Sequence, residues 1–414
     1  MNFETVENVL HINVDAVMTV AMAALLLLLG YWVKGKVKVL DRYCIPAPVV
    51  GGFIFMFVTW LGHISGTFAF NFTSTFQTPF MLAFFTTVGL GASASLLKKG
   101  GILLIIYWLC VGVLSIIQNT IGVSVAKLTG LEEAYGLLCG AIAMIGGHGA
   151  GLAYGGTFVE LGYSAGSLVG AAAATFGLIA GGLVGGPIGR RLIVKNNLTP
   201  DPEEHFDASV EKVNADTGQK LTSLDIMKNV TAILFCMAVG TMVSGWVGKL
   251  IGMSFPTYVG AMFVAIIVRN LNEYLHMYKF DYPLVERIGD VSLGLFLSMA
   301  LMTLKLWELA GLAGPMLVIL ICQVVMLSVL AYFIIFRILG SNYDAAVMIS
   351  GLMGHGLGAT PTAIVNMSAV TERYGMSHRA FMIVPIVGAF LVDIIYQPVT
   401  IWFIKTFVPA FTGS

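Results

Sequence analysis

The sequence is short of charge. Lysine, arginine, aspartate and glutamate make up only 11% of the 414 residues, whereas soluble domains carry about 25%. Hydrophobic residues make up 57%. So few charged groups cannot cover a surface that faces water on all sides, which excludes a soluble globular protein and indicates an integral membrane protein. The 22 basic and 22 acidic residues balance, so the charge gives no indication of a nucleic-acid partner.

Several catalytic and metal-binding patterns are also missing. The five cysteines lie singly in apolar segments, without a CxxC pair or zinc spacing, and we interpret them as apolar filling residues. There is no HExxH motif and no nucleophile–base pair of an intramembrane hydrolase. The glycine-rich runs belong to no soluble βαβ unit, so they indicate nucleotide binding only weakly. We therefore expect neither an enzyme nor a resident cofactor.

Apolar runs long enough to cross a bilayer recur along the chain. Five precede a polar stretch, which we interpret as a solvent-exposed linker, and five follow it. The runs lie near 14–33, 46–62, 79–97, 101–126 and 165–188, and near 228–250, 256–272, 288–306, 313–336 and 380–404. The predicted fold is an all-α polytopic membrane protein with an N-terminal unit (1–189), a linker (190–227) and a C-terminal unit (228–414).

The lysines and arginines between these runs predict the orientation, because cytoplasmic loops are rich in both. Basic residues follow the first, third, fifth, seventh and ninth runs, whereas the loop HISGTFAFNFTSTFQ after the second run has none. This pattern predicts a cytoplasmic linker and both termini outside.

The two halves resemble each other at a nearly constant offset. Because each half has an odd number of runs, the second copy is inverted in the membrane, an arrangement typical of secondary transporters. The matching features are IPAPVVGG with FPTYVGAM, Gly147–Gly149 with Gly354–Gly356, Glu160 with Glu372, Gly177 with Gly388, and Pro187 with Pro398.

Two further apolar segments, near 134–157 and 344–368, are interrupted by glycines in AMIGGHGAGLAYGG and LMGHGLGATPTA. An uninterrupted span at either place would spoil the alternation of basic loops. We therefore predict two re-entrant hairpins, whose arms of about ten helical residues rise about 15 Å. This rise is half of the hydrocarbon thickness, so the two tips should meet near the midplane from opposite sides.

The tips predict a binding site. Irregular backbone inside a membrane is tolerated only against protein or a wet cavity. Thr360 and Pro361 predict the N-cap and first residue of a helix whose positive end would face an anion such as a carboxylate. Thr362 and Asn366 lie on one face of that helix. The substrate site is predicted to include Thr360, Thr362 and Asn366 of this helix, together with Gly147, His148, Gly149 and Gly356.

Close packing and a passive channel are alternatives to this interpretation. Glycines spaced for helix contact account for much of TFGLIAGGLVGG (175–186), and each tip histidine has a structural alternative, a hydrogen bond to backbone. Packing alone does not account for the proline, threonines and histidines at the tips. A channel would line a continuous pore with polar residues, but here they cluster at the tips.

Asp393 lies within the tenth apolar run, in VGAFLVDIIYQPV, and the residue at its repeat position is Gly182. A carboxylate inside a membrane is costly and marks a functional candidate. It suits a substrate ammonium or a sodium ion, and a salt bridge to another helix is the structural alternative.

Five motifs together make the chain resemble the bacterial glutamate:sodium symporter family over nearly its whole length: GGHGAG, GLGATPTAI, PFMLAFFTTVGL, SLGLFLSMALMTLKLWELA and TFGLIAGGLVGGPI. The resemblance implies sodium-coupled import of L-glutamate across the cytoplasmic membrane by an elevator-like motion, with Na⁺ as the coupling ion. It implies a homodimer in membrane lipid, with ten spans per chain. Another small carboxylate or amino acid is the alternative substrate. Asp393 and Thr175 are the expected sodium-site residues, and no other metal is expected.

Cysteines introduced at Thr75 and at Asp207, in a chain without its five native cysteines, should react with a membrane-impermeant maleimide from opposite sides of the membrane. The reason is that Thr75 lies in a loop without basic residues and Asp207 lies in the charged linker. Labelling of both positions from the same side would rule out the inverted repeat.

Overall fold

Helices make up most of the computed structural model, which describes residues 2–6, 9–42, 45–200, 222–251, 256–309 and 311–409. Three π-helical segments, η1 (Leu138–Ile142), η4 (Ala331–Ile335) and η5 (Val387–Leu391), and a 3-10 turn, η3 (Leu306–Leu309), interrupt or join them. The helices are α1 (Ala16–Lys36), α2 (Lys38–Arg42), α3 (Ala47–Ser65), α4 (Gln77–Gly91), α5 (Ala94–Thr129), α6 (Glu133–Leu137), α7 (Gly147–Glu160), α8 (Gly166–Asn196), α9 (Ser223–Ile251), α10 (Thr257–Leu275), α11 (Tyr282–Met302), α12 (Ala313–Leu330), α13 (Phe336–Ile338), α14 (Tyr343–His355), α15 (Thr360–Tyr374), α16 (His378–Ile386) and α17 (Val392–Phe407).

The long apolar helices identify a polytopic membrane protein. Among the described residues, six helices are long and apolar enough to cross a bilayer: α1, α3, α5, α8, α9 and the continuous α12–α13 segment. The bent pair of α16 and α17, whose axes differ by 43°, would make a seventh. Each of the ten apolar runs falls on a helix, but α4 has only 15 residues. The count of ten spans therefore stays a prediction.

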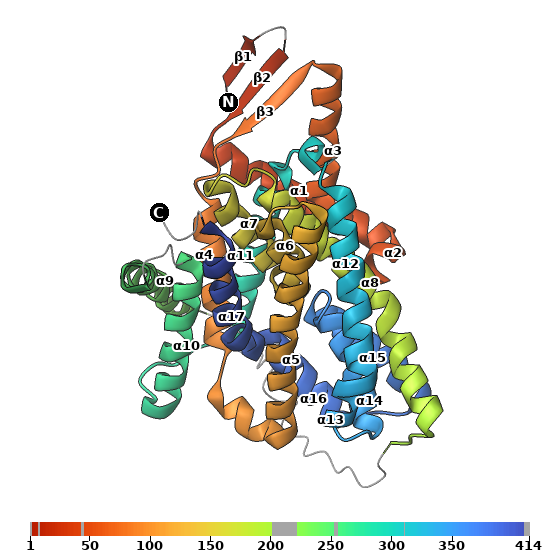
Figure 1. The fold of residues 1–414 in the computed structure, drawn as a ribbon. Helices are drawn as coiled ribbons and strands as arrows, with labels where there is room; N and C mark the ends of the chain where they lie inside the picture. The colour runs from red at the N-terminus through yellow and green to blue at the C-terminus, as the bar shows by residue number, and fades with distance from the viewer. Residues whose placement is uncertain are drawn as a thin grey trace.

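A small β-sheet departs from the all-α prediction. Strand β1 (Asn2–Val6) pairs antiparallel with β2 (Val9–Val14), and β2 pairs parallel with β3 (Phe68–Phe72). Strand β3 lies in the loop that the sequence analysis treated only as a connection, and its FAFNF pattern alternates phenylalanine with smaller side chains. Phe55 of α3 packs edge-on against Phe70, which anchors the sheet to the helices at the N-terminal end of the molecule (Figure 1).

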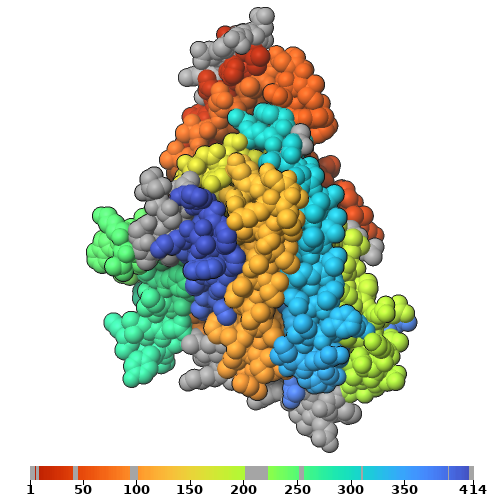
Figure 2. Space-filling view, viewed as in Figure 1, coloured from red at the N-terminus to blue at the C-terminus, as the bar shows by residue number. Residues whose placement is uncertain are grey.

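The helices form two groups with few contacts between them. Group I contains α1, α3, α4, α9, α10 and α11, and group II contains α5 to α8 and α12 to α17. Each group takes helices from both halves of the chain. Within group II, α5 lies between α17 and α12, as the space-filling view shows (Figure 2). Every residue of α14 is buried, so this helix is surrounded by protein.

The ends of the predicted linker are helical. Helix α8 continues through Arg190 to Asn196, and α9 begins at Ser223. The extension is favoured because IGRRLIVKN contains good helix formers and ends at Asn197, which takes the left-handed conformation that commonly stops a helix. Residues 201–221, including Asp207, lie outside the described residues.

The packing of α7 on α8 predicts the effect of one substitution. A Cβ atom at Gly170 would overlap the carbonyl oxygen of Gly151, so Gly170→Ala should lower the free energy of unfolding by about 1–3 kcal/mol. Gly186 lies on the same helix, and a Cβ there would meet no heavy atom within 4 Å, so Gly186→Ala serves as the control. Thermal unfolding of both purified variants checks this. A melting temperature of Gly170→Ala equal to that of the control would contradict it.

Candidate functional site

Two broken helices meet at the centre of group II. The first broken helix consists of α6, η1 and α7. Its interruption between Ile142 and Gly147 is called the first break. The second broken helix consists of α14 and α15. Its interruption between His355 and Thr360 is called the second break. Gly147 has a φ of +60°, and a Cβ there would lie 2.9 Å from the carbonyl oxygen of Gly358. The backbones of the two breaks therefore lie in contact, where only glycine fits without strain.

Helix α8 packs across both breaks. A Cβ at Gly177 would overlap the carbonyl oxygen of Leu357, and one at Gly181 would lie 2.9 Å from the carbonyl oxygen of Met353. These contacts confirm that glycines in TFGLIAGGLVGG serve close packing. They also bring α8 directly against the second break.

His148 and Thr175, both predicted site residues, are in contact beside the first break. His148 Nε2 lies 2.9 Å from Thr175 Oγ1, and that hydroxyl donates its hydrogen to the carbonyl oxygen of Ala171 at 2.8 Å. Since the threonine hydrogen is already used, the imidazole donates from Nε2 and its Nδ1 is the acceptor. Gly149 is the next residue, and a Cβ atom there would lie 3.2 Å from the ring of Phe84 on α4. Gly149 therefore lies at the boundary with group I.

The second break contains buried polar atoms without partners. His355 and Thr362 are each 1% exposed. Both ring nitrogens of His355 and the hydroxyl of Thr362 lack a hydrogen-bond partner among the described residues. A Cβ at Gly388 of η5 would lie 2.6 Å from Thr360 Oγ1 and 3.1 Å from His355 Cδ2. Buried polar groups are nearly always paired in folded proteins, so these atoms mark a place for a ligand or water.

The structure corrects the predicted cap of α15. The N-cap is Ala359, whose φ of −165° and ψ of 159° are extended, and Thr360 is already the first helical residue. No side chain caps this helix. The chain turns one residue earlier than predicted, and the Thr360 hydroxyl lies against η5 instead of capping. Backbone N–H groups of the first turn therefore lack a side-chain acceptor, which keeps them available to an anion.

Asn366 has a structural partner set. Its Nδ2 donates to the carbonyl oxygens of Gly181 at 3.0 Å and Ser350 at 3.3 Å. Both amide hydrogens are thus used to hold α15 against α8 and α14. Thr362, one turn earlier on the same face, keeps its free hydroxyl, so the structure separates the roles of these two predicted site residues.

Asp393 belongs to a polar cluster on α17 that reaches the first broken helix. Gln397 Nε2 donates to Asp393 Oδ1 at 3.3 Å and to Tyr396 Oη at 3.1 Å, and Tyr154 of α7 donates to Gln397 Oε1 at 2.5 Å. The Tyr396 hydroxyl occupies the space that a Cβ at Gly146 would need. In the part of the chain that the structure describes, Asp393 has no basic partner, so the alternative of a salt bridge between helices has no support.

The two predicted sodium ligands lie in separate hydrogen-bond groups. Among the described residues, Thr175 bonds with His148 and Ala171, whereas Asp393 bonds with Gln397. Of the two, only Asp393 supplies a negative charge, and carboxylate and carbonyl oxygens are the ligands that hard cations prefer. Asp393 is therefore the stronger candidate.

The sequence analysis missed the amides of α5 and α12. Gln118 Nε2 donates to the carbonyl oxygen of Gly356 at 2.7 Å, and Asn119 Oδ1 accepts from the backbone N–H of Ala141 at 3.0 Å. Gln323 of α12 donates to the backbone carbonyl of Gln118 at 2.8 Å. One helix therefore holds both broken helices. Uncharged amides inside apolar runs, as in SIIQNTIG and ILICQVV, are the signal that would have found them.

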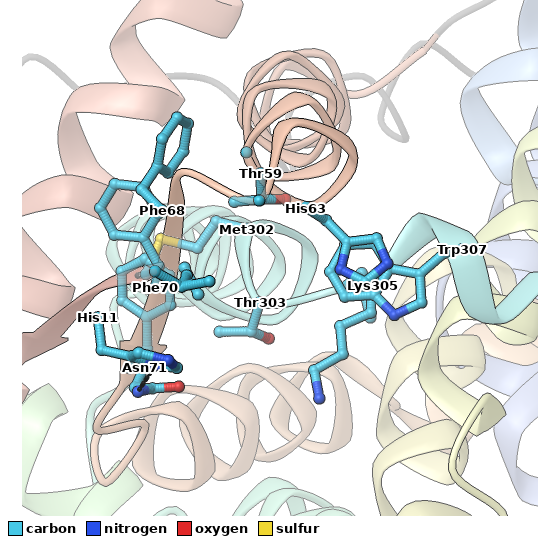
Figure 3. Close-up of a pocket in the computed structure, with 16 residues that line it drawn as sticks. His11, Thr59, His63, Phe68, Phe70, Asn71, Met302, Thr303, Lys305 and Trp307 are labelled. Atoms are coloured by element: carbon cyan, nitrogen blue, oxygen red, sulfur yellow. Dashed lines mark hydrogen bonds between the residues drawn. The ribbon is translucent and has the colours of Figure 1, made fainter. Parts of the chain in front are cut away.

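A pocket of about 290 Å³ lies elsewhere, between the β-sheet, the end of α3 and the η3 turn (Figure 3). His63 of α3 stacks there on Trp307, with ring centroids 3.9 Å apart, and Thr303 and Lys305 of the same segment as Trp307 also line the pocket. None of the predicted site residues lines this pocket. The polar groups at the two breaks remain the best candidate for the functional site.

Comparison with known proteins identifies the family. The chain matches the family model described as "Sodium/glutamate symporter" over residues 12–376. It is 42% identical over 388 residues to the sodium/glutamate symporter of Escherichia coli (strain K12), covering 92% of this chain and 96% of that protein. The sodium/glutamate symporter of Haemophilus influenzae is 41% identical over 381 residues, covering 91% and 94%. The chain therefore belongs to the sodium/glutamate symporter family, a family of transporters rather than enzymes.

Proposed function

We propose that this protein imports L-glutamate together with sodium ions, and that the substrate binds where the two broken helices meet. The contact between Gly147 and Gly358, beside the unpaired polar atoms of His355 and Thr362, is the observation that carries this proposal. Family membership supports the choice of glutamate and sodium.

The chemistry of the breaks suits an acidic amino acid. Helices α7 and α15 begin at the two breaks without side-chain caps, so each offers backbone N–H groups and a positive dipole end to a carboxylate. Glutamate has two carboxylates. Asp393 is connected to α7 through Gln397 and Tyr154. Its neighbour Tyr396 contacts Gly146 at the first break. Asp393 supplies the negative charge that an ammonium group or a sodium ion requires. Another small carboxylate or amino acid is the alternative substrate.

We further propose that the broken helices are re-entrant hairpins in two inverted repeats of five spans each, residues 1–189 and 228–414, joined by the linker. The composition of the helix groups supports this: group I combines the first three long helices of each half, and group II combines the remaining ones. Gln118 and Gln323, 205 residues apart, lie on equivalent helices of the two halves. The basic loops support a cytoplasmic linker and outward termini.

The proposed transport step is an elevator-like movement of group II against group I, within a homodimer in the bacterial cytoplasmic membrane. The scarcity of contacts between the groups supports it, because a body with a sparse interface moves at lower cost than one with an interlocked interface. All predicted substrate residues belong to group II, so the site would travel with that group.

Replacing Asp393 tests the role of the intramembrane charge. Asp393→Asn keeps the size and most hydrogen bonding but removes the counter-charge, so sodium-driven glutamate uptake into proteoliposomes should fall to background while the melting temperature stays near that of the wild type. The control is Glu160→Gln, the same change at an exposed position on α7, which should keep uptake. Normal uptake by Asp393→Asn, or loss of uptake together with loss of fold, would remove Asp393 from the site.

The two residues on one face of α15 predict opposite outcomes. Thr362→Val removes a hydroxyl that has no hydrogen-bond partner among the described residues, so it should weaken glutamate binding about tenfold or more while leaving thermal stability intact or raised. Asn366→Ala removes two hydrogen bonds between helices and should lower the melting temperature. Thr362→Ser is the control that should keep binding. Unchanged affinity of Thr362→Val would show that this hydroxyl does not touch the substrate.

A further inference from the structure

A basic groove lies where α8 and α15 end, away from the two breaks. Its volume is about 880 Å³. The residues that line it come from the last turns of the two helices: Gly186, Pro187, Ile188, Arg190, Arg191, Val194, Lys195, Ala369, Val370, Arg373 and Tyr374. Nothing in the proposed transport mechanism uses these residues.

The charge of the groove has one sign. Four cationic side chains line it, Arg190, Arg191, Lys195 and Arg373, and no acidic side chain from the described part of the chain does. Within the described ranges, none of the four forms an ion pair with an acid. Their recorded partners are aromatic: Lys195 Nζ lies 5.5 Å from the ring centre of Tyr332, and the Arg373 guanidinium lies 5.7 Å from that of Tyr374. A cluster of uncompensated cations attracts an anion.

The position of the groove along α8 indicates where that anion comes from. Arg190 lies about 36 Å along the helix axis from Gly166, at 1.5 Å per residue. This length exceeds the hydrocarbon thickness of about 30 Å, so the cations lie at the level of the lipid headgroups. One turn before them, Pro187 and Ile188 give the groove an apolar wall, which Val370 of α15 continues.

We infer that this groove binds the phosphate headgroup of an anionic phospholipid, with an acyl chain along the apolar wall. Arg190, Arg191 and Arg373 suit the phosphate, because a guanidinium donates two parallel hydrogen bonds to phosphate oxygens. A bound headgroup would bridge α8 and α15, which the buried amide of Asn366 already connects nearer the second break. The lipid would therefore stabilise the body that carries the substrate site.

The test compares lipid binding by purified full-length protein after delipidation. Phosphatidylglycerol should raise the melting temperature of the wild type, whereas phosphatidylcholine and inorganic phosphate should not. The groove variant R190Q/R191Q/R373Q should bind phosphatidylglycerol roughly 100-fold more weakly, because each basic residue near an anionic headgroup contributes about fivefold. The matched control K249Q/K279Q/R337Q changes the net charge equally at exposed positions outside the groove and should bind like the wild type.

Two further variants keep the inference falsifiable if the groove variant is unstable. R190K/R191K/R373K preserves the charge and should retain most of the binding, and R373Q alone should weaken it about fivefold. Equal weakening in the groove variant and the control would overturn the inference, because bulk charge would then explain the effect. Unchanged binding by the groove variant would also overturn the inference. This is the result expected if the acidic linker after Pro200, rather than a lipid, occupies the groove. Equal stabilisation by inorganic phosphate would exclude a lipid site.

Discussion

The contact between two interrupted backbones, at Gly147 and Gly358, is the constraint on which the rest of the structure depends. A helix that breaks inside an apolar protein leaves N–H and C=O groups that must find partners or a ligand. Here Gln118 and Asn119 of α5 form hydrogen bonds with backbone groups of the two broken helices. The glycines of α8 let its backbone approach the second break. The surrounding helices, which are long and apolar enough to cross a bilayer, separate this polar centre from the lipid.

The polar groups at the second break that lack hydrogen-bond partners are what suits the site to transport. Within the described part of the chain, the side chains of His355 and Thr362 are buried without hydrogen-bond partners, and no side chain caps the first turn of α15. Each unpaired buried group costs about 1–3 kcal/mol, which a substrate bound at the proposed site would recover by pairing with it.

The sequence predicted the features that depend on local patterns. Apolar length located the helices, glycines located both breaks, and Pro361 marked the start of the helix after the second break, because these signals act within one segment. The β3 strand was missed because FAFNF is stabilised by pairing with β2, more than fifty residues away in the chain. Asn366 was predicted as a substrate ligand, but its amide bonds to Gly181 and Ser350, which only the tertiary arrangement brings within reach. Gln118 and Asn119 were overlooked although two adjacent amides in an apolar run are a local signal, because their partners, the carbonyl oxygen of Gly356 and the N–H of Ala141, are brought near only by the tertiary fold.

Because the two breaks meet through main-chain atoms, their chemistry is nearly the same whatever the sequence around them. Mutation at Gly147 or Gly177 can add bulk, but it cannot exchange one recognising group for another. New substrate preferences in descendants of this protein would therefore have to arise from the side chains around the breaks, such as Thr362, His355 and Asp393. The fold would therefore constrain evolution to keep the backbone groups proposed to bind carboxylates. Only the side chains that contact the rest of the substrate would vary.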